Sequence, residues 1–225
     1  NNHAMDYGPE GLLDTLGALK RAGVSAIGAG KDLREAERFR VIEARGLRVA
    51  LLAFTSTFPL ESWAGEGRPG VAGARLERLP ALLARARLAA DVVIVSFHGG
   101  TELAEEPNEV QRAFARAAID AGADLVVGHH PHVVQPIEEY RGRWVLHSLG
   151  NFLFVSPTPA TRWGVVARAA VGRGGVRRVE LVPVDTWYGE LKPAAPEGAR
   201  AVKEALDRWG ALTLSPDRLA LTELP

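Results

Sequence analysis

The stretch Asp124-Leu-Val-Val-Gly-His-His-Pro-His132 joins a short apolar run to three histidines, His129, His130 and His132. The run 124–128 predicts a buried strand, so the histidines follow directly at its carboxyl end. Histidine is the commonest protein ligand for transition metals. A His-x-His pair on a turn can direct two imidazoles at one ion. We therefore expect a metal site at this strand end, with His130 and His132 at its centre.

Strand-like and helix-like segments alternate on both sides of this stretch. The apolar residues before residue 125 are spaced as in helices at four places, so we predict helices over 6–22, 32–38, 76–90 and 108–121. Short apolar runs predict strands over 24–28, 91–97 and 124–128. Two-stranded hairpins are expected around three turns: 45–46, 141–142 and 172–175. Alternation followed by hairpins predicts a mixed α/β fold, with a long loop over 55–73, a last helix over 197–209 and a weakly patterned tail.

His98 follows the predicted strand 91–97 in the same way that the histidine turn follows 124–128. One helix separates the two strands, and a right-handed crossover would place them near each other in one sheet. In open α/β sheets, ligands bind outside the carboxyl ends of the strands. We therefore expect His98 and the histidine turn to meet at one edge of the sheet.

Imidazole sites for zinc, manganese or iron usually add carboxylates or water. Asp6 and Glu102 are the local acidic candidates, and Ser148 or Asn151 could hold a ligating imidazole in place through a hydrogen bond. Structural explanations stay open for several of these residues. His129 can face away from its neighbour in an extended turn, and Ser148-Leu-Gly-Asn151 can be a simple turn.

The composition sets limits on the class of protein. The 225 residues suit one domain, and we expect a main domain over 1–190 with a C-terminal helix and tail, 191–225, packed on it. A net charge of +0 gives no indication of a nucleic-acid partner. The chain has no cysteine, which excludes disulfides, thiolate ligands and thiol nucleophiles.

Six motifs stand in the order found in CapA-type proteins of poly-γ-glutamate capsule biosynthesis, a family of the calcineurin-like metallophosphoesterase superfamily. They are Asn1–Gly8, Gly28–Gly30, Ser96–Glu102, Gly122–Asp124, Gly128–His132 and Ser148–Phe152. This resemblance implies a sandwich of two mixed sheets flanked by helices, in the order α/β/β/α. It also implies a site for two divalent ions, manganese, zinc or iron, at the strand ends.

The resemblance further implies a role for individual side chains. Asn2, His98, His130 and His132 match metal ligands of the superfamily, and His3 matches its general acid. Asp6 could hold the His3 imidazole in one tautomer, and Glu102 matches a family position near the site. In the family, a strand bearing an aspartate and an Asn-Leu-Glu segment precede the Asn-Asn-His motif. The first strands and their acidic ligands are therefore expected to be missing from this sequence, as in an N-terminally truncated chain.

The implied function is a metal-dependent hydrolase of phosphoesters or related anionic bonds. An alternative is a non-catalytic component that binds or assembles the polyanionic capsule polymer, for which arginine supplies most of the positive charge. A third hypothesis is a mononuclear zinc hydrolase in which Glu102 completes the ligand set. The resemblance implies a place in the cell envelope, outside the cytoplasm, with any membrane attachment through the missing N-terminal segment.

Overall fold

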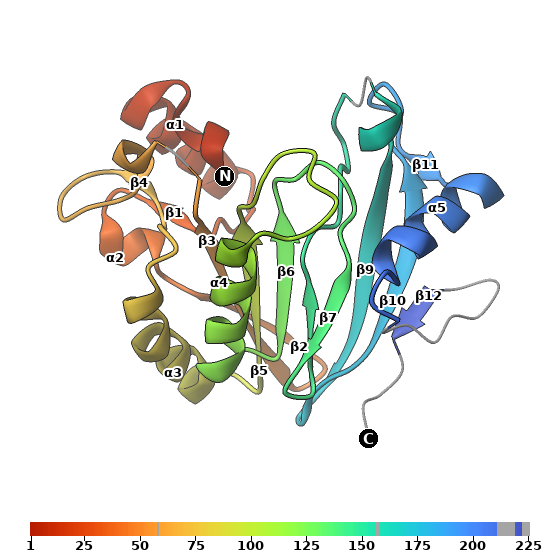
Figure 1. The fold of residues 1–225 in the computed structure, drawn as a ribbon. Coiled ribbons are helices and arrows are strands. Elements are labelled where there is room, and N and C mark those ends of the chain that lie inside the picture. Colours follow the sequence, from red (N-terminus) through yellow and green to blue (C-terminus); the bar gives the residue numbers. More distant parts are fainter. Residues whose placement is uncertain (58, 156–157, 211–218, 222–225) are drawn as a thin grey trace.

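The computed structural model describes residues 1–225 except 58, 156–157, 211–218 and 222–225. Within these residues the strands form a six-stranded sheet, a four-stranded sheet and a two-stranded pair. Figure 1 shows the two larger sheets facing each other, with α3 and α4 outside the first and α5 outside the second. The predicted two-sheet sandwich flanked by helices is confirmed; the first sheet is mixed, and the described strands of the second sheet all pair antiparallel.

The first sheet has the strand order β2-β3-β5-β6-β8-β7. Its strands are β2 (Arg40–Ala44), β3 (Leu47–Thr55), β5 (Val92–His98), β6 (Leu125–His129), β7 (Ile137–Tyr140) and β8 (Arg143–Leu146). The central strands β3, β5, β6 and β8 run parallel, and the edge strands β2 and β7 are antiparallel to their neighbours. The carboxyl ends of β3, β5 and β6 therefore reach the same edge of the sheet.

The second sheet is built on the long hairpin of β9 (Trp163–Gly172) and β10 (Gly175–Asp185). Two short strands, β11 (Lys192–Pro193) and β12 (Leu219–Leu221), also pair with β10. The local pattern predicted this hairpin, and the resemblance predicted a second sheet. It forms a separate sheet because its apolar side packs face to face on the first one, in a buried cluster that includes Leu146 and Leu181.

The helices are α1 (Gly8–Arg21), α2 (Leu33–Ala36), α3 (Leu79–Ala89), α4 (Glu109–Asp120) and α5 (Pro196–Leu206). Short 3-10 helices are η1 (Asn2–Met5), η2 (Leu60–Ser62), η3 (Leu76–Arg78) and η4 (Pro159–Thr161). Among the described residues, no helix combines the length and the apolar character needed to cross a membrane.

Helix α4 makes the crossover between β5 and β6. A capping box holds its first turn, and its buried face packs on β5. Asn108 caps it as predicted, and the Asn108 side chain accepts a hydrogen bond from the Gln111 N–H at 3.0 Å. The Gln111 side chain bonds back to the Asn108 N–H at 3.0 Å, which completes a capping box. Phe114 stacks on Phe97 of β5 with ring centroids 4.3 Å apart. The start of α4 is thereby held beside the carboxyl end of β5.

The predicted strand 24–28 is wrong. The Val24 N–H donates to the carbonyl of Leu19 and so closes the end of α1, and the Val24 side chain is 53% exposed. Extended pairing begins only at β1 (Ala29–Gly30), which is antiparallel to β4 (Gly70–Val71). The predicted loop 55–73 contains β4 and η2, because Ala64, Val71 and Ala72 bury their side chains.

The C-terminal prediction is met in part. Helix α5 begins at Pro196 and ends at Leu206, close to the predicted span, and it packs on β9 and β10. Most of the predicted tail lies outside the described residues. The division into 1–190 and 191–225 stays a prediction.

The capping box of α4 yields a first prediction. Asn108→Ala removes the acceptor for the Gln111 N–H and should lower the free energy of unfolding by about 0.5–2 kcal/mol, measured by urea titration. Asn108→Asp keeps an acceptor at the same place and should retain most of the stability. A loss in Asn108→Asp equal to that in Asn108→Ala would contradict the capping role.

Candidate metal centre

The pairing of β5 with β6 brings the histidines of two strand ends together. The strands are parallel, and His98 stands opposite His129 in their register. The Gly99 N–H donates to the His129 carbonyl at 3.0 Å, which continues the pairing one step past β5. His130 and His132 follow on the turn that leaves β6. The convergence expected from the strand order is present in the structure.

The four predicted metal ligands form one cluster. The ring centroids of His98 and His130 lie 4.9 Å apart, and those of His130 and His132 lie 6.3 Å apart. Asn2, on η1, places its Oδ1 2.9 Å from His98 Nε2. Residues almost a hundred positions apart in the chain therefore present imidazole nitrogens and an amide oxygen to one another.

Backbone strain accompanies this arrangement. His130 has φ 106° and His132 has φ 62°, both in the left-handed region that costs a non-glycine residue of order 1–3 kcal/mol. Gly128 precedes them, and a Cβ there would overlap the carbonyl oxygen of His147 on the neighbouring chain segment. The close approach at Gly128 and the tight turn after it aim His130 and His132 back toward His98.

Burial favours the neutral form of three imidazoles at this edge, His98, His129 and His130. It lowers the pKa of His98 to about 3, and the positive charge of the Asn1 amino group adds to this effect, followed by His130, His129 and His132 when they are charged. Burial also lowers the pKa of His129 and of His130, although the charge of Glu102 works in the opposite direction on His130. Neutral imidazole is the form that binds metal, so the electrostatics favour a ligand role at neutral pH.

The donor atoms at the site suit a divalent transition metal by type, but the described side chains do not form a complete ligand set. His130 Nδ1 is buried and has no hydrogen-bond partner among the described residues, as expected of an atom that awaits a ligand. Imidazole nitrogen and amide oxygen suit zinc, manganese or iron. However, the described residues contain no group of three or more His, Cys, Asp or Glu side chains positioned to hold an ion. Glu102, the acidic candidate from the sequence, is exposed and has no hydrogen bond or ion pair among the described residues, although its charge acts on His130.

His3 and Asp6 form a pair at the rim of the cluster. His3 Nδ1 lies 2.8 Å from Asp6 Oδ2, and both side chains are exposed. His3 is close enough to His130 for its charge to lower the pKa of His130. Asp6 is three residues after His3, and this spacing on the short 3-10 helix brings its carboxylate within reach of the imidazole. The contact uses Nδ1 of His3, so Nε2 is available for other contacts.

A hollow of about 260 Å³ opens beside the cluster. Asn2, Ser56, Gly100 and His130 contribute to its lining. Gly100 has φ 124°, and a Cβ there would overlap the Gln111 side chain. Glycine at position 100 therefore allows the loop to adopt this conformation and leaves the hollow next to His130 open.

The remaining predicted site residues separate into two groups. Asn151 contacts the site, since its Oδ1 lies 2.7 Å from His132 Nδ1. Ser148 does not, and its hydroxyl accepts a hydrogen bond from the Gly150 N–H at 3.2 Å within the turn. His129 lines a different hollow, of about 380 Å³, together with His98 and Ser96.

Sequence reasoning missed Phe154, whose ring lies 5.0 Å from that of His132. It belongs to an exposed apolar run, Phe152–Val155, at the rim of the site. A run of four apolar residues after Ser-Leu-Gly-Asn was a signal in the sequence that could have indicated this apolar rim.

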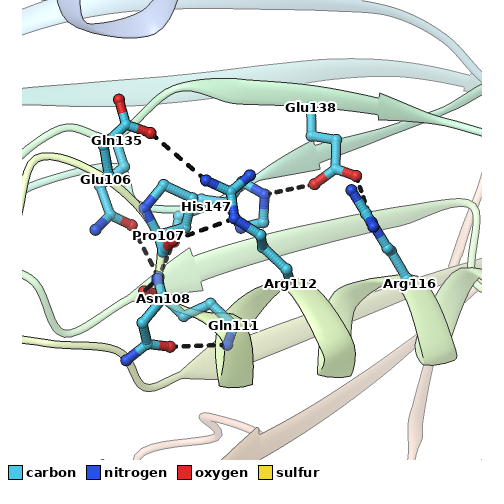
Figure 2. Close-up of polar contacts among 9 residues, drawn as sticks. All are labelled: Glu106, Pro107, Asn108, Gln111, Arg112, Arg116, Gln135, Glu138 and His147. Carbon is cyan, nitrogen blue, oxygen red and sulfur yellow. Dashed lines mark hydrogen bonds and ion pairs between the residues drawn. The ribbon is translucent and has the colours of Figure 1, made fainter.

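A buried polar network behind the site was also missed (Figure 2). Gln111 Nε2 donates to Gln135 Oε1 at 2.8 Å, and Gln135 Nε2 donates to the Ala104 carbonyl at 2.8 Å. Gln111 and Gln135 are both almost fully buried. These bonds tie the start of α4 to the segment after His132 and to the loop that carries Glu102.

The same network continues through Glu138 of β7, which contacts Arg116 of α4 and His147 just after β8. Glu138 Oε2 lies 2.9 Å from His147 Nε2, and Arg116 Nε donates to Glu138 Oε1 at 2.7 Å (Figure 2). Burial acts to raise the pKa of Glu138, but the hydrogen bonds from His147 and Arg116 hold it below its ordinary value. Burial lowers the pKa of His147. A neutral His147 therefore donates to an ionised Glu138.

The comparisons with known proteins agree with this architecture. The chain belongs to the family described as bacterial capsule synthesis protein PGA_cap, which it matches over residues 1–156. The description of this family names bacterial capsule synthesis.

Two relatives and one solved structure illustrate the similarity. The chain is 40% identical to the PGA biosynthesis protein CapA of Bacillus subtilis, over 89% of this chain and 53% of the relative. It is 34% identical to the capsule biosynthesis protein CapA of Bacillus anthracis, over 86% of this chain and 48% of the relative. The chain thus spans about half the length of these relatives. The NAD nucleotidase of Haemophilus influenzae shares the fold with TM-score 0.51 and 12% identity, over 92% of this chain and 45% of that structure.

The Glu138 chain gives a stability prediction with a matched control. Glu138→Gln removes the charge that Arg116 contacts and weakens the acceptor for His147, so the free energy of unfolding should fall by about 1–3 kcal/mol in a urea titration at pH 7. Glu139→Gln alters the next residue of β7, which is exposed, and should change stability far less. Equal losses in the two variants would show that the buried chain adds no stability.

The pKa of His98 gives a prediction about pH. Between about 6.5 and about 3 the unfolded chain binds a proton at His98 that the folded protein does not bind. The free energy of unfolding of metal-free protein should therefore fall as the pH is lowered through this window. His98→Gln should make that fall less steep in urea titrations from pH 7 to 4. An unchanged slope would mean that His98 is not held neutral by the fold.

Proposed function

We propose that this chain carries the imidazole part of a divalent-metal centre in a phosphoesterase-like hydrolase of poly-γ-glutamate capsule biosynthesis. The observation that carries the proposal is the convergence of His98, His130 and His132 on one sheet edge, with a buried and unbonded His130 Nδ1 at its centre. Membership in the capsule synthesis family supports the pathway. The substrate would be an anionic ester or the polyanionic polymer itself.

Asn2, His98, His130 and His132 would hold the metal. His98 Nε2 and Asn2 Oδ1 face each other across 2.9 Å, and a carbonyl oxygen can only accept, so in the metal-free protein a proton lies between them. A metal ion would take the place of this proton. When bound, such an ion polarises a phosphoryl oxygen and lowers the pKa of a bound water. The resemblance to the superfamily suggests manganese, zinc or iron, and two ions in the complete protein.

Asn151 would orient His132 for this task. Asn151 Nδ2 donates to the Thr161 carbonyl at 3.2 Å, which turns Oδ1 toward His132. His132 Nδ1 must then be the protonated nitrogen, since Oδ1 is an acceptor 2.7 Å away. Nε2 of His132 is left with a free lone pair. Hydrogen bonds of this kind fix the tautomer of metal-binding histidines in many proteins.

His3 would serve as the proton donor to the leaving oxygen. Asp6 Oδ2 lies 2.8 Å from His3 Nδ1, so it can hold the ring in place. The proton on Nε2 then faces away from Asp6 and can pass to a substrate. General acid catalysis of this type contributes about 10²–10⁴-fold to the rate.

The first test compares two histidine variants in the full-length natural protein. His132→Ala should lose bound metal after dialysis against metal-free buffer, measured by elemental mass spectrometry. His3→Ala should keep its metal but lower turnover of p-nitrophenyl phosphoesters by about 10²–10⁴-fold, because only the proton transfer is lost. Full metal occupancy in His132→Ala would overturn its ligand role.

Two further outcomes would change the proposal, one about the reaction and one about the metal site. Metal bound without turnover of any phosphoester, together with intact binding of poly-γ-glutamate, would favour the non-catalytic polymer-binding alternative. Absence of metal after loading the wild-type protein with manganese, zinc or iron would overturn the metal centre.

A further inference from the structure

A second charged hollow lies at the edge of the first sheet opposite the histidines. It measures about 410 Å³, and its charged lining consists of Arg87, Arg141, Arg143, Arg173, Asp120 and Asp124. In Figure 1 the turn between β7 and β8 and the turn between β9 and β10 both lie at the lower edge of the view, whereas the histidine ends of β5 and β6 point upward. Strand β6 separates the two sites by about 15–20 Å.

The hollow carries an excess of positive charge in a chain whose net charge is +0. Its lining has four arginines and two aspartates. A larger hollow, of about 940 Å³ beside α2 and α3, is also lined by four arginines, but four acidic residues balance them. Positive charge is therefore concentrated at the first of these two hollows.

The arginines differ in how far their donors are already used. Arg87 is committed to the fold, because it donates to the carbonyls of Asp91 and Gly122 and to the Asp124 carboxylate. Arg143 contacts Asp124 through Nη1 at 3.3 Å, and its Nε and Nη2 form no hydrogen bond with a described residue. Arg173 is exposed and forms no ion pair within the described part of the chain. Donors of Arg143 and Arg173 thus remain for a ligand.

The fold brings these donors together from both sheets. Gly175, at the start of β10, has φ 110°, and a Cβ there would overlap Arg143 Nη1. The absence of a side chain lets the β9–β10 hairpin settle against the Arg143–Asp124 pair. Arg173, two residues earlier in that turn, is thereby carried to the hollow beside Arg141, whose partner Asp120 lies 2.8 Å away.

We propose that this hollow is an anion-binding site for a ligand with several carboxylate or phosphate groups. Guanidinium groups present a planar fork of donors that matches both oxyanions. Buried Asp124 would hold Arg87 and Arg143 in position, and Arg141 and Arg173 would close on the ligand from the two turns. The site is separate from the histidine cluster and does not depend on a metal.

Binding of two probes to metal-free protein tests the proposal: a γ-linked glutamate hexamer and inorganic pyrophosphate. Isothermal titration at low ionic strength should show saturable binding of at least one probe. The amide signals of Gly122, Gly142 and Gly174 should shift in NMR spectra. The double variant Arg141→Gln/Arg173→Gln should weaken binding by about tenfold or more. Tighter binding of the hexamer would identify polymer carboxylates as the ligand, and tighter binding of pyrophosphate would identify a phosphate compound.

A control removes the same charge elsewhere. Arg21→Gln/Arg200→Gln changes two exposed arginines outside the hollow and should leave affinity nearly unchanged. An equal loss in this control would overturn the proposal in favour of general charge attraction. Binding of neither probe, or shifts confined to the histidine edge, would overturn it as well.

Discussion

The candidate site depends on the parallel pairing of β5 with β6, which sets His98 opposite His129. Helix α4 makes the crossover between these strands, and stacking of Phe114 on Phe97 fixes its position. Because parallel strands end at the same edge, the residue after each strand is delivered to the same place. A shift of one residue in this register would turn every side chain of the strand to the opposite face and would separate His98 from His130.

Bringing the histidines together costs free energy at the sheet edge, and the surrounding hydrogen bonds and packing offset that cost. His130 and His132 adopt left-handed backbone angles, and His98 is buried enough to hold its pKa near 3. Buried hydrogen bonds of Gln111 and Gln135 stabilise the segments on either side of the turn. Strain and desolvation concentrated on neutral imidazoles are typical of functional sites, where a bound ligand returns part of the cost.

Much of the fold was predictable because short-range sequence patterns determine its helices and strands. Apolar periodicity and the cap at Asn108 located α4, and the histidines after β5 and β6 located the candidate site. The error at 24–28 arose because a short apolar run can close a helix as well as form a strand. The local patterns alone did not separate the second sheet from the first, because the face on which β9 and β10 pack is decided by tertiary contacts; only the family resemblance implied two sheets. The link between Gln111 and Gln135 joins residues 24 positions apart, and no local pattern signals it.

The most direct test of the account is X-ray absorption spectroscopy of the full-length protein loaded with zinc. The account predicts several imidazole nitrogens at about 2.0–2.1 Å from the ion, and it predicts that His132→Ala reduces their number. The control is His147→Ala, a change in the buried network away from the cluster. Folded His147→Ala protein should give the same number of imidazole nitrogens around the zinc as the wild-type protein. A coordination shell made of oxygen atoms alone in the wild-type protein would contradict a histidine-centred metal site.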